Sequence, residues 1–323
     1  MANTQNSATM WNCPNFVGDL YLLGANQTPF LNMIGGLAGG GIARVATMEF
    51  SMAQPWALEA AAQPAIHETA SVTAPNPWTY VRARDLNTCQ IYQRAISVSY
   101  MKQSTTGVVT SFVGGSATTQ MSDLGVNPVP NEKDFQIAAA MKQIAVDVEF
   151  TFLNGTYNAS TAANNAAATG GIVPGCATCT VAGGSGYLTK AMIDELLREM
   201  AAAGAGFTNM VMFVNAFQKQ RLTDLFGYAP EDRNVGGMNI KQIETDFCML
   251  GVVWAPKMVS TKVLIADLSV CRPVFCPVPD KGDLFYEDLS KVGAAERGQI
   301  YGQIGLDFGA EEFHGSCTGL LDA

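Results

Sequence analysis

The sequence predicts an α+β fold that is completed by contacts with other chains, and three features support this. Hydrophobic residues make up 48% of the 323 residues and charged residues only 15%, against about a quarter in ordinary soluble domains. A long loop rich in proline and tryptophan separates two predicted strands, and one long helix is followed by an α/β unit. A chain so poor in charge must bury apolar surface in a large core or against other chains. Its length and irregularity favour the second.

Residues 1–43 are predicted to form an arm and not a domain. In the segment TPFLNMIGG, Thr28 can cap a short helix and Pro29 can occupy its first position. Five glycines between positions 35 and 41 then interrupt regular structure. They lack the Lys-Ser/Thr pair of a nucleotide-binding loop and follow no predicted buried strand, so they indicate a flexible hinge.

Residues 44–101 are predicted to form a long hairpin. Its two strands are RVATMEFSM and CQIYQRAISVSYM, and apolar residues alternate with polar ones in the second. Four prolines, Trp56 and Trp78 lie between them. A loop of this length is typical of a binding loop or a projecting arm, and exposed tryptophans would favour an interface. The alternative, in which both tryptophans sit in a local core, stays open without the partner chain.

The clearest helix is predicted at residues 132–154. Asn131 is its candidate N-cap, acidic residues follow in its first turn, and Asn154-Gly155 closes it. One apolar stripe at helical spacing runs along it, formed by Ile137, Met141, Ile144, Val148 and Phe152. At 1.5 Å per residue the helix is about 33 Å long, enough to form the backbone of a domain.

An α/β unit is predicted after a polar loop, YNASTAANNAAATGG. Thr189 caps a helix that Gly204 ends, NMVMFVN is a buried strand, and Asn215 caps a second helix that Gly227 ends. Two apolar strands, GVVWAP and KVLIAD, complete the unit. The last segment, QIYGQIGLDF, alternates with period two and is predicted to return beside the long helix, which needs a covering sheet.

Composition and motifs argue against several function classes. The net charge of −9 and pI near 4.7 disfavour specific nucleic-acid binding, which needs a basic surface. Neither an apolar run of about 18 residues nor a signal-peptide pattern occurs. Nucleotide-binding, metalloprotease and serine-hydrolase motifs are also missing, and His67 and His314 are interpreted as surface or interface residues. We therefore expect no catalytic site, no cofactor and no enzyme activity.

The eight cysteines are scattered, as expected for small buried residues in a reducing compartment. Cys176 and Cys179 form a lone CxxC in a glycine-rich loop, without a second pair at zinc-site spacing. Because structural zinc normally takes four ligands, a zinc site is disfavoured. A disulfide that forms after cell lysis is the other alternative for this pair.

The order of these segments resembles the Hong Kong 97 fold of tailed-phage major capsid proteins. Within that fold, the chain is similar to a group first described as a domain of unknown function. The segments that carry the resemblance are TPFLNMIGG, NTCQIYQRAISVS, AVDVEFTFLNG and GQIYGQIGLDFGAEEFHGSCTGL. The resemblance covers nearly the whole chain. It implies a major capsid protein that assembles into hexamers and pentamers of an icosahedral head around double-stranded DNA.

The same resemblance implies domains and contact residues. The domains are an N-terminal arm (1–43), an extended loop (44–101), a peripheral domain (102–185 and 280–323) with its spine helix (132–154), and an axial α/β domain (186–279). The expected contacts between subunits are Phe30 and Leu31 of the arm, Trp56 and Trp78 of the extended loop, and Asp232 and Arg233 in the axial loop 228–240.

Partners follow from the resemblance and its departures. The first lysine is Lys102, so the extended loop cannot supply the isopeptide bonds that lock the shell of the fold's founding member. Shell stability is expected to rest on apolar burial, with a decoration protein as a further aid. About 43 residues before the hairpin are too few for a scaffolding domain, so a separate scaffolding protein and a portal are expected. Assembly is placed in the host bacterial cytoplasm, without a membrane, and the product is a virion that contacts packaged DNA non-specifically.

Three alternatives remain at this level. Another phage structural protein, such as a tail-tube or decoration protein, would have a shorter helix and a mainly β core. A secreted β-rich adhesin fits the Ala/Gly/Thr-rich loops, but the missing signal peptide and the capped α/β unit count against it. An enzyme with an unrecognised site would gather titratable groups in one pocket of a single subunit.

Overall fold

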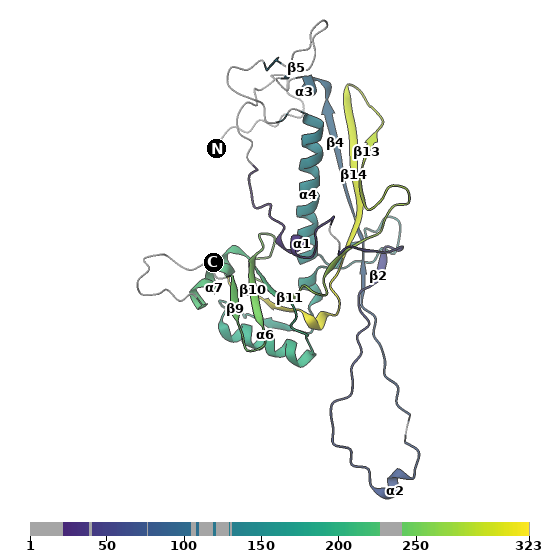
Figure 1. The fold of residues 1–323 in the computed structure, drawn as a ribbon, viewed down its shortest axis with the longest axis vertical. Coiled ribbons are helices and arrows are strands. Elements are labelled where there is room, and N and C mark those ends of the chain that lie inside the picture. The colour runs from purple at the N-terminus through teal and green to yellow at the C-terminus, as the bar shows by residue number, and fades with distance from the viewer. Residues whose placement is uncertain are drawn as a thin grey trace, which may run out of the picture.

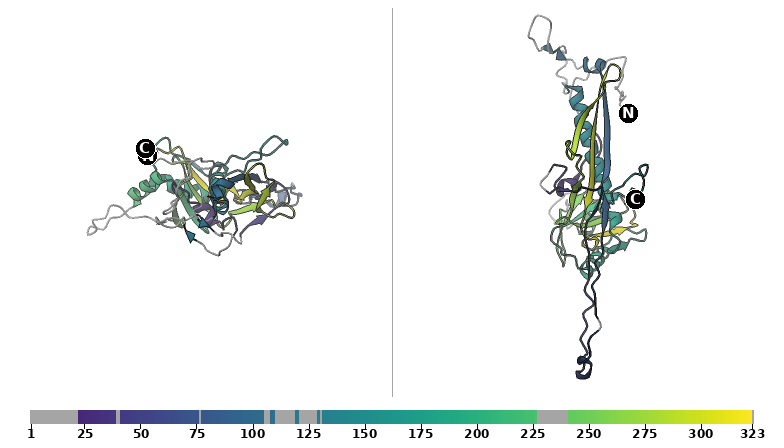
Figure 2. Two further views of the ribbon diagram at one scale, coloured as in Figure 1. Left: turned by 90° about the horizontal axis from the view of Figure 1, so that it is seen from above. Right: turned by 90° about the vertical axis from the view of Figure 1, so that its right-hand side faces the viewer.

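The computed structural model describes residues 22–38, 41–75, 77–104, 108–109, 119–120, 129, 131–226 and 241–322. Figure 1 shows an elongated molecule in which a long helix and a long sheet form the upper part. An α/β body lies beside the foot of the helix, and a long loop projects below. Figure 2 shows the same projection from the side. Among the described residues, no helix combines the length and apolarity needed to cross a bilayer.

The upper part consists of the long helix α4 (Glu132–Asn154) and a five-stranded sheet. The strands are β1 (Ala43–Arg44), β4 (Gln90–Ser99), β12 (Arg272–Phe275), β13 (Leu284–Leu289) and β14 (Ala295–Asp307). The central strand β14 pairs antiparallel with β4 along one edge and with β12 and β13 along the other. Ile300, Ile304 and Leu306 of β14 are buried, and β14 packs on α4. The predicted return of this strand beside the long helix is confirmed.

Helix α4 begins and ends where its sequence predicts. The Asn131 side chain accepts hydrogen bonds from two backbone N–H groups of the first turn, which satisfies donors that no helical carbonyl can reach. Ile144, Val148 and Phe152 of the predicted stripe are fully buried, whereas Met141 is 40% exposed. The stripe is therefore buried only over its C-terminal half.

Short elements connect these parts. They are α1 (Pro29–Met33), α3 (Tyr100–Ser104), α5 (Ile172–Gly175), β5 (Val108–Val109), β6 (Thr119–Gln120) and the 3₁₀ turn Glu311–Phe313. Pro29 occupies the first position of α1 as predicted, but the Thr28 side chain makes no capping hydrogen bond.

The α/β body contains a six-stranded mixed sheet in the order β7-β15-β11-β8-β10-β9. Its strands are β7 (Thr180–Ala182), β8 (Met210–Val214), β9 (Gln242–Glu244), β10 (Met249–Trp254), β11 (Val263–Asp267) and β15 (Gly315–Thr318). Helices α6 (Lys190–Ala203) and α7 (Ala216–Phe226) accompany it. The Thr189 side chain caps α6, and Gly204 ends it at φ 95°, as predicted.

Both faces of the six-stranded sheet are covered. Every residue of β8 and β11 is buried, as in a strand with no face in water. One face packs with Leu196 and Met200 of α6. The other face contributes Phe213 to the cluster that contains Phe152 of α4 and Ile304 of β14. A single core therefore joins the α/β body to the spine helix.

Strand pairing does not follow the expected segments one by one, and the domain division itself stays a prediction. β7, expected in the peripheral segment 102–185, pairs with β15 in the six-stranded sheet. β15, expected in the returning segment 280–323, pairs there with β11. β12, expected in the axial segment 186–279, pairs instead with β14. The chain thus passes between the two sheets more often than expected, because sheet membership is decided by hydrogen-bonding neighbours that are distant in sequence.

The strand pairing in the hairpin also differs from the prediction. The two strands predicted to pair were those around residues 44–52 and 89–101. In the structure β2 (Glu49–Ser51) pairs with the short strand β3 (Leu86–Thr88), and β4 pairs with β14. Only the base of the hairpin is a ladder, and the rest opens into a long loop with one short helix, α2 (Glu68–Ser71).

Candidate assembly surfaces

The projecting part of the extended loop, residues 52–85, is exposed over most of its length. The backbone hydrogen bonds that join its two sides lie toward the base, at Met52, Ala83 and Asp85, and the others belong to the short turn from His67 to Thr73. Trp56 and Trp78 are 59% and 67% exposed, as predicted for a loop that projects. Other large apolar side chains of the loop are also exposed, namely Leu58, Ile66, Val72, Tyr80 and Val81. So much apolar surface on one projection marks an interaction surface.

The outer part of the loop carries little charge, while Arg82, Arg84 and Asp85 lie at its base. Between positions 53 and 81 its only Asp, Glu, Lys or Arg residues are Glu59 and Glu68. The one described aromatic contact on it is the edge-on packing of Trp56 and Tyr80, at 6.0 Å between ring centroids. A surface of this kind resembles the core of a protein–protein interface, where charged residues are depleted and aromatics enriched.

A buried polar network fixes the base of the loop. Asn87 is 1% exposed, and its side-chain amide donates to the carbonyls of Gly170 and Leu306 at 3.0 and 2.8 Å. Its side-chain oxygen accepts from the backbone N–H groups of Thr88 and Gly170. Thr169 adds a bond from its hydroxyl to the Thr88 carbonyl at 2.8 Å. Sequence reasoning missed these residues, because a single polar residue in a strand carries no signal of its distant partners.

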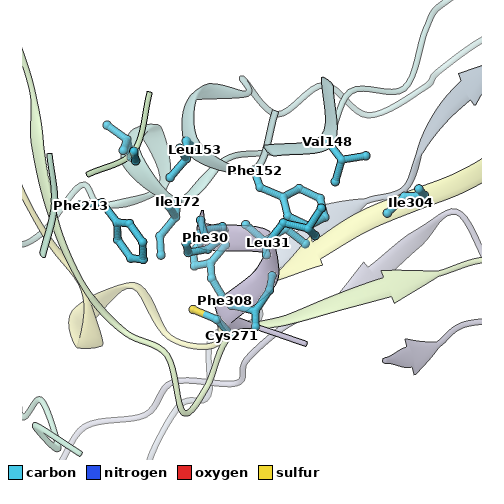
Figure 3. Close-up of a cluster of buried hydrophobic side chains, with 14 of the residues drawn as sticks. Phe30, Leu31, Val148, Phe152, Leu153, Ile172, Phe213, Cys271, Ile304 and Phe308 are labelled. Atoms are coloured by element: carbon cyan, nitrogen blue, oxygen red, sulfur yellow. The ribbon is translucent and has the colours of Figure 1, made fainter. Parts of the chain in front are cut away.

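The arm residues Phe30 and Leu31 lie inside their own subunit. They are 0% and 2% exposed, and Figure 3 shows both among the side chains of Val148 and Phe152. The Phe30 ring packs edge-on against Phe213 at 5.3 Å. In this conformation they expose no surface to a neighbour, and their expected role as contacts between subunits stays a prediction. The apolar pattern of α1 does not indicate whether its side chains pack in the core of their own subunit or against a neighbouring subunit.

Glu149 of α4 holds α1 in that position. Its two carboxylate oxygens accept the backbone N–H groups of Phe30 and Leu31 at 3.0 and 2.7 Å, and the side chain is fully buried. Burial raises the pKa of Glu149 to about 7, and the two hydrogen bonds oppose this rise. The sequence held one signal of this role: position 149 lies three residues before Phe152, beside the apolar stripe.

The two histidines have structural roles. His67 is exposed, and its ring accepts the Ala70 N–H as the N-cap of α2. His314, predicted at a surface or interface, is instead 0% exposed. Its Nε2 lies 2.6 Å from the Phe308 carbonyl, and its Nδ1 accepts from the Asp267 N–H. The prediction was wrong because burial of this ring depends on Asp267 of β11, which lies 47 positions earlier in the chain.

The cysteines of the CxxC segment are buried free thiols, with Cys176 5% and Cys179 1% exposed. Burial raises the pKa of both thiols, which disfavours the thiolate that metal binding and disulfide exchange require. In the part of the chain that the structure describes, no three His, Cys, Asp or Glu side chains are grouped to hold a metal. Asp232, Arg233 and the axial loop 228–240 lie outside the described residues.

Buried acids on the two sheets serve the fold. Asp307 forms an ion pair with Arg272 at 2.8 Å. Asp267 accepts hydrogen bonds from the Ser269 hydroxyl and from the backbone N–H groups of Thr208, Asn209 and Ser269. Burial raises its pKa, but these four bonds together lower it below the ordinary value. These groups face different backbone segments and do not converge on one cleft, so they form no acid–base pair.

A spine helix on a long sheet, a second sheet at its foot and a projecting apolar loop define the fold of shell-forming capsid subunits. The chain is similar to a subunit of the Cyanophage A-1(L) capsid, with 11% identity, coverage of 98% of each chain and a TM-score of 0.64. It is similar to the capsid of the native GTA particle, with 10% identity, coverage of 97% and 96%, and a TM-score of 0.59. It also resembles the SrpI encapsulin of Synechococcus elongatus, with 11% identity, coverage of 95% and 92%, and a TM-score of 0.56.

The family follows from the sequence itself. The model of the SU10 major capsid protein family matches residues 2–321, and the chain belongs to that family. No curated protein matches the chain in sequence. The protein is therefore a phage major capsid protein of the Hong Kong 97 type, a structural subunit of the virion and not an enzyme.

Proposed function

We propose that this capsid protein forms the hexamers and pentamers of an icosahedral phage head that encloses double-stranded DNA. The observation that carries the proposal is the extended loop, whose tryptophans and aliphatic side chains find no burial on their own subunit. On a neighbouring copy the same side chains would be covered. The five-stranded sheet with α4 would serve as the peripheral domain, and the six-stranded sheet would serve as the axial domain that faces the centre of each capsomer.

Assembly by many modest contacts suits this subunit. A standard protein interface buries about 1,600 Å², and a subunit with several neighbours gains stability from their number. Each partly exposed tryptophan can contribute on the order of 3 kcal/mol when it is buried against a neighbour. Weak single contacts allow wrongly placed subunits to dissociate before the shell closes.

Further partners belong to the same proposal. A separate scaffolding protein and a portal would direct assembly in the host cytoplasm, and a decoration protein would reinforce the finished shell. The net charge of −9 supports an inner wall that repels DNA phosphates, so packaged DNA would be contacted only non-specifically.

The test removes the loop's aromatic anchors from the full-length protein. The double variant Trp56→Ser/Trp78→Ser should keep the melting temperature of the unassembled subunit, because neither side chain packs in its core. The concentration at which shells form, measured by light scattering and electron microscopy, should rise by about 100-fold or more, since each lost 1.4 kcal/mol of contact energy is a factor of ten.

A matched control changes polar residues on the same loop. Gln54→Ser/Gln63→Ser alters two exposed positions without removing apolar surface, and should assemble as the wild type does. Unchanged assembly of the tryptophan variant would contradict the proposal. So would wild-type protein that stays monomeric at all concentrations with its loop protected from proteases.

A further inference from the structure

The arm segment 22–42 is joined to the rest of the subunit by very few polar contacts. Among the described residues, the backbone hydrogen bonds of this segment are internal, for example from Ile34 N–H to the Phe30 carbonyl. The first ladder to the rest of the chain begins at β1, which pairs with β12. The two bonds from Phe30 and Leu31 to Glu149 are therefore the only described hydrogen bonds between this segment and the rest of the chain.

Glycines with left-handed backbone angles flank α1 on both sides. Gly24 has φ 96°, and Gly35 and Gly36 have φ 107° and 68°. Residues with side chains rarely adopt these angles, so the chain can turn at these positions with little steric hindrance. Between these glycines, Phe30 and Leu31 of α1 and the following Ile34 insert buried side chains into the core. Helix α1 is thus a short buried segment with a glycine turn on each side.

Among the described residues, no cationic group pairs with the buried carboxyl of Glu149, which holds α1 in place. Burial raises the pKa of this carboxyl, and the two backbone N–H groups of α1 oppose the rise. Helices α1 and α5, which pack on α4, contain no titratable residue. On β4, Arg94 is paired with Asp147 on a more exposed side of α4, and on β14, Asp307 is paired with Arg272. Tyr92, Cys176 and Cys271 are the uncharged titratable groups of the same core.

We propose that α1 is a detachable anchor of the N-terminal arm and that Glu149 of the spine helix controls how tightly it is docked. With α1 in place the carboxyl is sealed from water and held only by two N–H donors. With α1 released the carboxyl would face solvent, where ionisation is favourable. Proton binding to one side chain is thereby linked to the position of the whole arm. The use of this linkage in shell formation rests on the proposed function, whereas the docking itself is a property of one subunit.

The direction of the pH effect follows from linkage. The docked pKa of about 7 is above the ordinary value of 4.5, which an exposed carboxyl would have in the released state. The docked state therefore binds a proton more readily, and docking is tightest below pH 4.5. It weakens as pH rises from 4.5 to 7, after which it is constant. Between pH 5 and pH 8 the docking constant should fall by roughly 50- to 100-fold.

Hydrogen exchange of the full-length, unassembled subunit tests this. The amides of Phe30 and Leu31 are the donors to Glu149, so a peptide covering α1 reports docking directly. Its protection factor, corrected for the intrinsic pH dependence of exchange, should fall by the stated factor from pH 5 to pH 8. A peptide from β8 monitors global unfolding. In Glu149→Gln the fall at α1 should vanish, because the amide does not titrate.

Two further variants separate the effect of apolar packing on α1 docking from the effect of Glu149 titration. Phe30→Ala should lower the protection of α1 at every pH but keep its pH dependence. The substitution removes apolar packing between α1 and the core and leaves the Glu149 carboxyl in place. Glu195→Gln, at an exposed position on α6, should behave as wild type. The proposal is overturned if wild-type α1 protection does not change with pH, or if Glu149→Gln retains the wild-type pH dependence. Neither result depends on shell assembly, so each is distinguishable from failure of the proposed function.

Discussion

At the scale of single residues, two buried titratable groups respond to pH in opposite directions. Glu149 has a raised pKa, so its contribution to the stability of the native state increases as pH falls. His314 has a pKa lowered by burial, opposed by its hydrogen bond to the Phe308 carbonyl and by the charge of Asp267. The neutral ring, with Nε2–H donating to Phe308 and Nδ1 accepting from Asp267, satisfies both nitrogens. A global stability measurement would sum the two effects, so each needs its own comparison.

His314 should make the subunit sensitive to acid. Its contribution is fully present above the ordinary pKa of 6.5 and is lost as pH falls toward the lower folded pKa. Relative to His314→Gln, the wild type should lose unfolding free energy between pH 7.5 and pH 5.5, because the unfolded chain takes up a proton that the folded chain excludes. Urea denaturation of both proteins at the two pH values measures this. A difference that stays constant across the range would contradict it.

At the scale of elements, the C-terminus of α4 packs closely on the backbone that follows it. The Gly155 N–H donates to the Thr151 carbonyl, and the Gly171 N–H donates to the Gly155 carbonyl, both at 2.7 Å. A Cβ atom at Gly171 would lie 2.6 Å from the Gly155 nitrogen and 2.7 Å from the Thr151 oxygen. Because the atoms it meets belong to the backbone, relief requires the end of the spine helix to move.

Gly171→Ala should therefore destabilise the subunit. Overpacking of this kind costs about 1–3 kcal/mol, and the loss should appear as a lower denaturation midpoint with an unchanged slope in urea. The control is Gly206→Ala, where the added Cβ meets only the Thr208 hydroxyl at 3.6 Å. Equal midpoints for the two variants would show that the backbone at Gly171 can relax freely.

The positions of helices and strands could be predicted where the sequence signal is local. The pairing of the strands could not. The caps at Asn131 and Thr189 and the stop at Gly204 use hydrogen bonds and angles within a few residues, and the structure has them. The pairing of β7 with β15 joins residues 136 positions apart, such as Thr180 and Ser316. No periodicity in either segment encodes that choice.

At the scale of the whole molecule, the extended loop has exposed apolar surface but no amine for covalent locking. Residues 44–101 contain no lysine, so an isopeptide bond from this loop has no nucleophile. Purified particles, boiled in denaturant with reductant, should run as a single band at the mass of one subunit. A ladder at multiples of that mass would contradict the expectation that apolar burial holds the shell.

The sequence alone determined the composition that calls for partner chains, the long helix with its caps, the buried strands of the α/β unit and the segments that resemble capsid proteins. Each depends on residue type or on spacing within one segment. The tertiary structure decided that Phe30 packs in its own core, that Glu149 is buried beneath it and that β15 completes a sheet begun far earlier. These outcomes depend on contacts between residues more than a hundred positions apart, whose geometry is set only when the whole chain has folded.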